Sequence, residues 1–320
     1  MPIIKTINLT KNYGKIKAVK DLNINIEEGE VFGFLGPNGA GKTTTIKMLS
    51  TLIAPTKGTA KVNGYDICTQ QTKVRESIGI VFQEPSSDEL LTGYENLKMH
   101  SLIYGIPKDE IEKRIEENLN LVELYDRKDS LVKTYSGGMR RRLEIARGLL
   151  HKPKVLFLDE PTLGLDPRGR EIIWRYIKRL VKELEMTILL TTHYMEEADS
   201  LTDRVCIIDH GHAVITDKPE KLKQMMGGDL VLLTAKNLDI KKLKQFSFVK
   251  KIEKKKGRFL VTVENAAQNL QTILRNIDTE YVEVHRPTLG DVFLRFTGKG
   301  LEEEESSWFQ KVIQYEVTNK

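Results

Sequence analysis

A glycine-rich segment near the N-terminus has the residue types and spacing of a loop that binds phosphate. It matches the pattern G-x-x-x-x-G-K-[ST] from Gly36 to Thr43, between an apolar run at 31–35 and a helical stretch that begins near Lys42. The glycines let backbone N–H groups and a helix N-terminus face a phosphate, while Lys42 adds positive charge and the Thr43 hydroxyl can hold Mg²⁺. A plain turn between strand and helix is the alternative, which this context disfavours. The candidate phosphate-binding residues are Gly36, Pro37, Asn38, Gly39, Ala40, Gly41, Lys42, Thr43 and Thr44.

Two consecutive acids, Asp159 and Glu160, follow the apolar run at 155–158. The carboxyl ends of strands are where open α/β sheets bind ligands. Beside a phosphate-binding loop, Asp159 would bind magnesium through water, and Glu160 could accept a proton from, or orient, a water that attacks a γ-phosphate. In a chain without such a loop, an acid pair at the end of a strand is more often a helix cap or a salt-bridge partner. The loop and the acid pair together predict a magnesium-dependent site for nucleotide hydrolysis.

The elements that must position these residues alternate apolar runs with amphipathic helical stretches over residues 1–225, which predicts an α/β domain with a largely parallel sheet. The apolar runs lie at 31–35, 78–82, 155–158, 188–191 and 205–208. Between the second and third runs, at about 84–150, apolar residues recur at helical spacing without a good buried strand. They are Ile111, Ile115, Leu119 and Val122. We therefore expect a helical insertion within the α/β domain.

A second, smaller domain is expected at 229–298, after a hinge at 224–229 that contains Gly227 and Gly228. Strands are expected at 230–233, 249–252, 258–263 and 281–285, and helices at 240–246, 266–277 and 290–296. The first six elements follow the β-α-β-β-α-β order of a ferredoxin-like α+β domain. In the tail, 299–320, an acidic run precedes apolar residues at helical spacing, so a short docking helix and frayed disorder are both open. Those apolar residues are Trp308, Phe309, Val312 and Ile313.

The composition predicts a protein that is soluble when isolated and resides in a reducing cytoplasm. Of its 320 residues 30% are charged, and the mean hydropathy is −0.35. No apolar run approaches the roughly 20 residues that span a bilayer, and the N-terminus lacks the pattern of a secretory signal. Cys68 and Cys206 stand apart, so neither a disulfide nor a cysteine metal site is expected. Because 50 basic and 45 acidic residues are mixed along the chain, the net charge of +5 does not predict a nucleic-acid partner.

A third motif, Tyr135-Ser136-Gly137-Gly138-Met139, opens an arginine-rich helix and makes the chain resemble the ATP-binding cassette (ABC) ATPases. It lies where this family carries its signature. Other positions of the family match in order, namely Tyr13, Gln83, the segment 164–167 (Gly-Leu-Asp-Pro) and His193. The resemblance implies a P-loop NTPase fold of the ABC type, with ATP and Mg²⁺ as ligands.

The resemblance also assigns roles that these residues would not suggest alone. Tyr13 would offer an aromatic face to adenine, although a lone tyrosine is more often an ordinary partly buried side chain. Gln83 is similar to the glutamine that touches both the magnesium shell and the membrane partner. His193 would contact the γ-phosphate and help to position the attacking water, whereas a satisfied histidine at the end of a strand is its alternative.

The segment Ser136, Gly137 and Gly138 leads into a helix N-terminus, a second anion site that the first nucleotide cannot fill. In the family this segment caps the ATP bound at the opposite subunit's loop, so the resemblance implies a head-to-tail dimer of two copies or of two related subunits. Tyr135 and Met139 depart from the commonest signature, Leu-Ser-Gly-Gly-Gln, which puts in doubt only a flanking contact. With Glu160 present, the site is expected to hydrolyse ATP.

Three further segments, 91–97, 194–199 and 287–294, resemble the daunorubicin/doxorubicin-resistance branch of the family. That resemblance implies an exporter whose membrane-spanning permease is a separate chain, with this subunit peripheral at the cytoplasmic face of the cell membrane. A soluble cassette protein acting on ribosomes or DNA is one alternative, but such proteins usually carry two cassettes or long coiled-coil insertions. A regulatory module that binds nucleotide without hydrolysis is another, against which Glu160 and His193 argue. The cargo is open.

Overall fold

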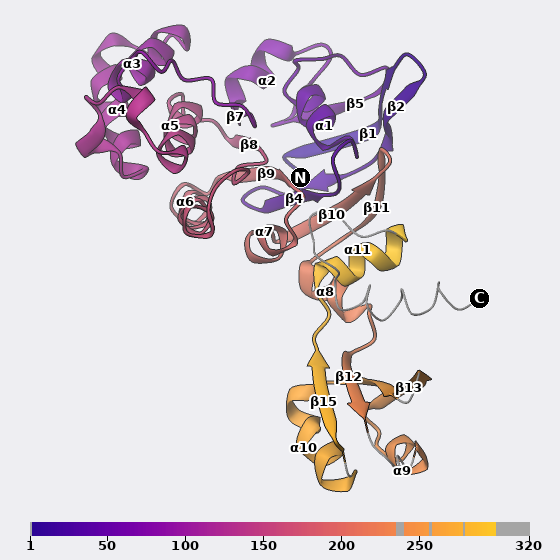
Figure 1. The fold of residues 1–320 in the computed structure, drawn as a ribbon. Coiled ribbons are helices and arrows are strands. Elements are labelled where there is room, and N and C mark those ends of the chain that lie inside the picture. The colour runs from indigo at the N-terminus through magenta and orange to yellow at the C-terminus, as the bar shows by residue number, and fades with distance from the viewer. Residues whose placement is uncertain (1, 235–239, 256–257, 278, 299–320) are drawn as a thin grey trace. The chain divides into compact units, whose positions relative to one another are not determined.

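The computed structural model describes residues 2–234, 240–255, 258–277 and 279–298, and the chain divides into two compact units, Met1–Thr216 and Asp217–Lys320 (Figure 1). The docking helix considered for residues 308–313 lies in the tail, outside the described residues. None of the helices in the described part of the chain combines the length and the apolar composition that crossing a membrane requires.

The first unit is built on a six-stranded sheet in the order β11-β10-β4-β9-β8-β7. The strands are β4 (Val31–Leu35), β7 (Ile78–Val81), β8 (Val155–Asp159), β9 (Thr187–Thr192), β10 (Arg204–Asp209) and β11 (His212–Asp217). From β10 to β7 each strand runs parallel to its neighbour, and every residue of β4, β8 and β9 is buried. The carboxyl ends of β4, β8 and β9 therefore meet at one edge, where Asp159 pairs with Thr191 and Leu35 with Thr192. The predicted α/β class with a largely parallel sheet is confirmed.

The first unit also contains an antiparallel sheet that the apolar runs did not predict. In it, β1 (Ile4–Tyr13) pairs with β2 (Ile16–Leu22), β3 (Asn25–Ile26) and β5 (Lys57–Val62), and β5 pairs with β6 (Tyr65–Asp66). Helices α1 (Lys42–Leu49) and α2 (Gln71–Ser77) belong to the same part of the chain. One apolar core is shared by the two sheets and includes Ile4, Leu9, Phe32, Phe34 and Phe157. The strands were missed because their residues alternate between buried and exposed and form no continuous apolar run.

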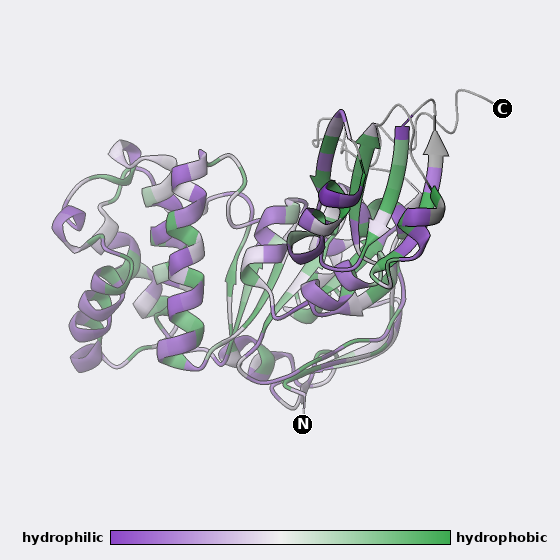
Figure 2. Ribbon diagram, turned by 90° about the horizontal axis from the view of Figure 1, so that it is seen from below, coloured by the Kyte–Doolittle hydropathy of each residue, from purple (hydrophilic) through white to green (hydrophobic). Residues whose placement is uncertain are grey.

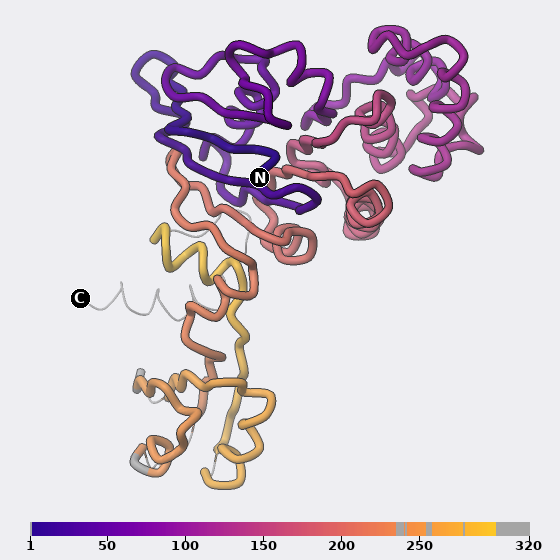
Figure 3. The backbone as a smooth tube through the Cα atoms, turned by 180° about the vertical axis from the view of Figure 1, so that it is seen from behind, coloured from indigo at the N-terminus to yellow at the C-terminus, as the bar shows by residue number. Residues whose placement is uncertain are grey.

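Three helices, α3 (Gly93–Ile103), α4 (Lys108–Leu121) and α5 (Gly137–Leu149), lie between β7 and β8 and gather at one side of the first unit (Figures 1 and 3). Thr92 and Glu95 form a reciprocal capping box that fixes the start of α3. On α4 the residues at helical spacing, Ile111, Ile115 and Leu119, are buried, whereas the remaining surface of this helix is hydrophilic (Figure 2). Two further helices, α6 (Pro167–Leu184) and α7 (Met195–Leu201), follow β8 and β9.

The second unit contains a four-stranded antiparallel sheet in the order β13-β14-β12-β15. Its elements are α8 (Pro219–Gln224), β12 (Asp229–Thr234), α9 (Ile240–Lys244), β13 (Val249–Lys255), β14 (Arg258–Val263), α10 (Ala266–Asn276), β15 (Tyr281–His285) and α11 (Leu289–Thr297). The chain order and the strand order together are those of the predicted ferredoxin-like domain. Alternate residues of β12 and β14, such as Val231 and Val261, pack with Ile273 of α10 in the core of this unit.

Candidate active site

The loop that follows β4 contains backbone positions that only glycine fits. A Cβ on Gly36 would lie 2.2 Å from the carbonyl oxygen of Ile208, and a Cβ on Gly41 would lie 2.3 Å from that of Ala18. Gly41 also has a φ of 104°, in the left-handed region that favours glycine, and it directly precedes α1. The loop thus brings bare backbone and a helix N-terminus to the ligand-binding edge of the sheet, an arrangement that suits a phosphate group.

Lys42, the first residue of α1, is buried, with 4% of its surface exposed. Its Nζ donates hydrogen bonds to the carbonyl oxygens of Gly36 (2.7 Å) and Pro37 (3.2 Å), and it lies 3.3 Å from Oε1 of Glu160. Burial lowers the pKa of Lys42, and the negative charge of Glu160 opposes part of that effect. The ammonium group of Lys42 therefore lies over the loop that follows β4, and phosphate oxygens could replace the oxygen atoms that it contacts.

Glu160 directly follows β8 and has a φ of 50°, which is uncommon for any residue except glycine. Its backbone N–H donates to the carbonyl oxygen (3.1 Å) and the hydroxyl oxygen (3.0 Å) of Thr191. Its carboxylate lies between Lys42 and His193, with Nδ1 of His193 3.2 Å from Oε2. Burial raises the pKa of Glu160, but the hydrogen bond with His193 and the charge of Lys42 outweigh burial and leave the pKa below its usual value. The carboxylate is therefore ionised at neutral pH and can accept a proton.

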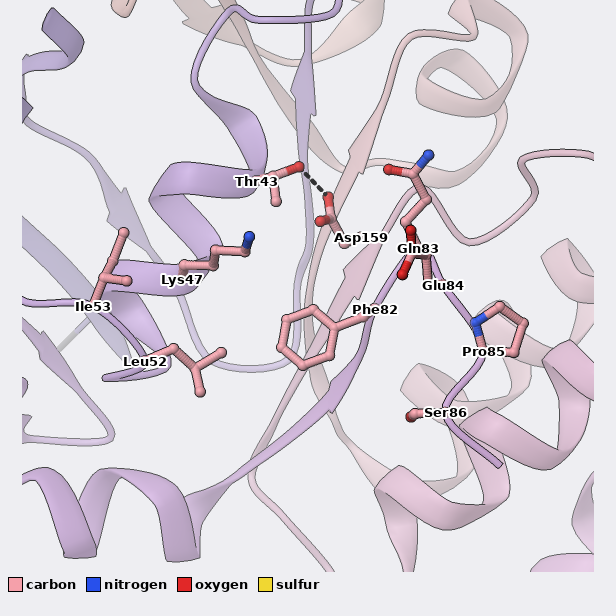
Figure 4. Close-up of a pocket in the computed structure, with 10 residues that line it drawn as sticks. All are labelled: Thr43, Lys47, Leu52, Ile53, Phe82, Gln83, Glu84, Pro85, Ser86 and Asp159. Carbon is pink, nitrogen blue, oxygen red and sulfur yellow. Dashed lines mark hydrogen bonds between the residues drawn. The ribbon is translucent and has the colours of Figure 1, made fainter. Parts of the chain in front are cut away.

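Asp159, the last residue of β8, accepts hydrogen bonds from the hydroxyl groups of Thr43 (3.1 Å) and Thr191 (2.6 Å). Figure 4 shows Thr43 and Asp159 facing each other at a cavity of about 640 Å³ that Gln83 also lines. The described residues contain no group of three or more His, Cys, Asp and Glu side chains that could hold a metal ion by themselves. Hydroxyl, carboxylate and amide oxygens are hard ligands of the kind that suits Mg²⁺ shared with a phosphate.

Two further predicted site residues, Tyr13 and Ser136, make contacts of their own. Tyr13, the last residue of β1, is 46% exposed, and Nζ of Lys11 lies 5.3 Å from the centre of its ring. Ser136 caps α5, its hydroxyl accepting a hydrogen bond from the N–H of Met139 (3.3 Å). In the described part of the chain, no hydrogen bond joins Ser136 to Lys42 or to Glu160. Among the described residues, the network of Lys42 and Glu160 is thus not hydrogen-bonded to Ser136, the residue that caps α5.

One residue of the site, Arg141, was not predicted from the sequence. It is 6% exposed in α5, and its guanidinium donates hydrogen bonds to the backbone carbonyl oxygens of Phe82, Gln83 and Glu160. An arginine-rich helix in the sequence does not reveal which arginine points inward, because the acceptors are backbone groups that every residue carries.

Two family models match separate parts of this chain. Residues 19–163 match the family described as ABC transporter, and residues 218–297 match the family described as ATP-binding protein DrrA1-3-like, C-terminal domain. Among curated proteins, the daunorubicin resistance ATP-binding protein DrrA2 of Streptomyces coeruleorubidus is 40% identical over 311 residues, covering 93% of this chain and 96% of the relative. The linearmycin resistance ATP-binding protein LnrL of Bacillus subtilis (strain 168) is 37% identical over 310 residues, covering 93% and 99%.

Solved structures of similar proteins cover about the length of the first unit. The structure of CbiO1 from Clostridium perfringens, part of the ABC transporter complex CbiONQ, is 33% identical with a TM-score of 0.65, covering 69% of this chain and 90% of that one. The dimeric post-hydrolysis state of the ATP-binding cassette MJ0796, bound to ADP and Pi, is 31% identical with a TM-score of 0.61, covering 67% and 98%. These likenesses agree in fold with the unit that carries the loop, the acid pair and the histidine.

Proposed function

This chain belongs to the ABC transporter family as an ATP-binding and ATP-hydrolysing subunit, and on that premise we propose that it powers export through a separate membrane-spanning permease. Similar proteins are named for resistance to daunorubicin and to linearmycin, and one that is 38% identical is the Nod factor export ATP-binding protein I of Ralstonia nicotianae. Two of these names refer to resistance and one to export, and they point to no single cargo. The chain would act at the cytoplasmic face of the membrane, with residues 1–225 as the ATPase domain and residues 229–298 aiding dimer contact or regulation.

The observation that carries the hydrolytic part of the proposal is the position of the Glu160 carboxylate, 3.3 Å from Nζ of Lys42 and 3.2 Å from Nδ1 of His193. When ATP binds, Lys42 would exchange Glu160 for phosphate oxygens, which frees the carboxylate to take a proton from the attacking water. His193 would orient that water and contact the γ-phosphate. Thr43, Asp159 and Gln83 would hold Mg²⁺, whose charge offsets the negative charge of the phosphates.

The position of Ser136 at a helix N-terminus, without a hydrogen bond to Lys42 or Glu160 in the described part of the chain, supports an ATP-sandwich dimer. Ser136, Gly137 and Gly138 surround the N-terminus of α5, where backbone N–H groups favour an anion. Because they make no hydrogen bond to Lys42 or Glu160 among the described residues, they would cap a phosphate held by another subunit. The partner in this dimer is a second copy or a related ATP-binding subunit.

A group of exposed apolar side chains supports the permease partner. Met99, Leu102, Ile103 and Tyr104 are all exposed at the C-terminal end of α3, although a soluble surface usually scatters such residues. The cavity that Asp159 lines at one side is bounded elsewhere by Leu52, Ile53 and Phe82 (Figure 4). A cytoplasmic segment of the permease would dock on the exposed apolar end of α3, and Gln83, which lines the cavity, would respond to the state of the nucleotide site.

The proposal is tested first by ATP turnover measured against protein concentration, with sizing in ATP and Mg²⁺. Turnover should rise more steeply than protein concentration, because two subunits build each pair of sites. The chain should also sediment with membranes only when its membrane-spanning permease is co-expressed, and each candidate membrane protein is tested in this way. Turnover strictly proportional to concentration, with a monomer in ATP, would exclude the sandwich mechanism. Sedimentation that does not depend on the membrane protein would exclude that protein as the partner.

Replacing Gly138 by alanine should lower ATP turnover without lowering the stability of the fold. A Cβ at this position meets no atom within 4 Å, and alanine in a helix is about 0.5–1 kcal/mol more favourable than glycine, so Gly138→Ala should melt at the same temperature or slightly higher. Turnover should nevertheless fall by about tenfold or more, because the methyl group crowds the capped phosphate. Gly148→Ala, in the same helix with its nearest Cβ contact at 3.5 Å, is the control and should keep normal turnover. Normal turnover in Gly138→Ala would contradict the capping role.

Removing the ring of Tyr13 should weaken ATP binding without changing the chemical step. Base-aromatic stacking contributes about 1–3 kcal/mol, so Tyr13→Ala should raise the Kd for ATP by about fivefold or more, whereas Tyr13→Phe keeps the ring and the affinity. Titration of both variants with ATP and with inorganic triphosphate checks this expectation. Because triphosphate has no base, its affinity should not change, and an equal loss for both ligands would contradict adenine stacking.

A further inference from the structure

The guanidinium of Arg141 joins three parts of the first unit. Arg141 lies in α5 and is 6% exposed. Its Nη1 donates to the carbonyl oxygen of Phe82 (2.6 Å), and its Nη2 donates to the carbonyl oxygens of Gln83 (3.2 Å) and Glu160 (3.1 Å). Because a guanidinium is planar and its donors have a fixed geometry, these bonds hold α5, the segment after β7 and the end of β8 in one arrangement.

The backbone conformation of Glu160 depends on hydrogen bonds with other segments of the chain. Its φ of 50° is a conformation that a residue with a side chain keeps only when its surroundings impose it. On the N-terminal side, the N–H is bound to Thr191 of the neighbouring strand. On the C-terminal side, the carbonyl oxygen accepts hydrogen bonds from the N–H of Leu163 (3.2 Å) and from Arg141 (3.1 Å). Of these contacts, only the one from Arg141 comes from the helices between β7 and β8.

We propose that Arg141 is a positioning residue for Glu160, which makes the place of the carboxylate depend on the position of helix α5. The proposal rests on the assignment of Glu160 as the base under the proposed function. The same helix carries Ser136 at its N-terminus, so a shift of α5 on capping the partner's phosphate would reach Glu160 of its own subunit through one side chain. Arg141 touches no substrate and acts only through the backbone that it holds.

The neighbouring arginine supplies a matched control. Arg142 donates to the carbonyl oxygens of Val122 (3.0 Å) and Glu123 (3.3 Å), which lie outside the site. Arg141→Gln should lower kcat by about tenfold or more and leave the KM for ATP within about twofold, since misplacing the base affects the chemical step alone. Arg142→Gln should keep kcat within about twofold of the wild-type value, even if its melting temperature falls as far as that of Arg141→Gln. Arg141→Lys keeps the positive charge but lacks the planar guanidinium with its several donors, so it should give an intermediate kcat. This variant replaces Arg141→Gln in the test if the glutamine variant does not fold.

A double substitution shows whether Arg141 acts through Glu160. In a Glu160→Gln background, Arg141→Gln should produce no further loss of the residual single-turnover rate, because the group that it positions is gone. Equal losses of kcat for Arg141→Gln and Arg142→Gln, or an undiminished loss in the Glu160→Gln background, would overturn the proposal. Glu160→Gln alone tests the assignment of the base, so a normal rate in that variant would refute the assignment, whereas a slow rate with additive losses would refute only the role of Arg141.

Discussion

Replacing Glu160 by glutamine is expected to lower ATP turnover by about 10²- to 10⁴-fold, the range that a general base contributes, while ATP still binds. Glutamine has nearly the same shape, so it can keep the contact with His193, but it cannot take a proton from water. Lys42 would lose its anionic partner, which stands 3.3 Å away, and would remain free for phosphate. ATP should therefore accumulate unhydrolysed between two subunits, and sizing should show a stable dimer in ATP and Mg²⁺.

The control for this variant is Glu76→Gln, which removes an exposed carboxylate from α2 and should change neither turnover nor dimer formation. Turnover of Glu160→Gln at the wild-type rate would show that another group accepts the proton. A variant that binds ATP, does not hydrolyse it and yet stays monomeric would keep the catalytic assignment and refute the ATP-sandwich dimer.

Parts of the fold with strong local patterns could be predicted from the sequence. The runs that became β4 and β8 are apolar throughout, because a central parallel strand is buried on both faces. In the second unit, β14 was predicted with its observed bounds, since it is rich in aromatic and β-branched residues and a glycine precedes it. In contrast, the antiparallel sheet of β1, β2 and β5 was missed. These strands mix exposed and buried residues without a continuous apolar run, and their pairing joins segments that no local pattern connects.

The candidate site could be predicted only where its chemistry depends on residue type. The glycine-rich loop and the acid pair are separated by more than a hundred residues in the sequence. Both follow a strand of the predicted parallel sheet, and because the carboxyl ends of parallel strands share one edge, they were expected to lie together. The contact between Lys42 and Glu160 was not predicted, because it depends on the conformation of a long, flexible lysine side chain that no sequence pattern specifies. Arg141 was not predicted either, since its acceptors are carbonyl groups.

Truncating Lys42 to alanine is expected to weaken ATP binding by about 10- to 100-fold, because a charge-assisted hydrogen bond contributes roughly 1.5–3 kcal/mol. The variant should therefore lose ATP binding itself, whereas Glu160→Gln loses only the later hydrolysis step, and titration with a fluorescent ATP analogue separates the two.

The pKa of Glu160 lies below its usual value of 4.5, so its ionisation stabilises the fold above about pH 4.5, and that contribution is lost as the pH falls through the lower, folded pKa. Without Lys42 this contribution should shrink, so the melting temperature of Lys42→Ala should depend less on pH below about pH 4.5 than that of the wild type. Lys61→Ala, which removes an exposed lysine from β5, is the control for both measurements, and unchanged nucleotide affinity in Lys42→Ala would contradict the phosphate-binding role of the loop.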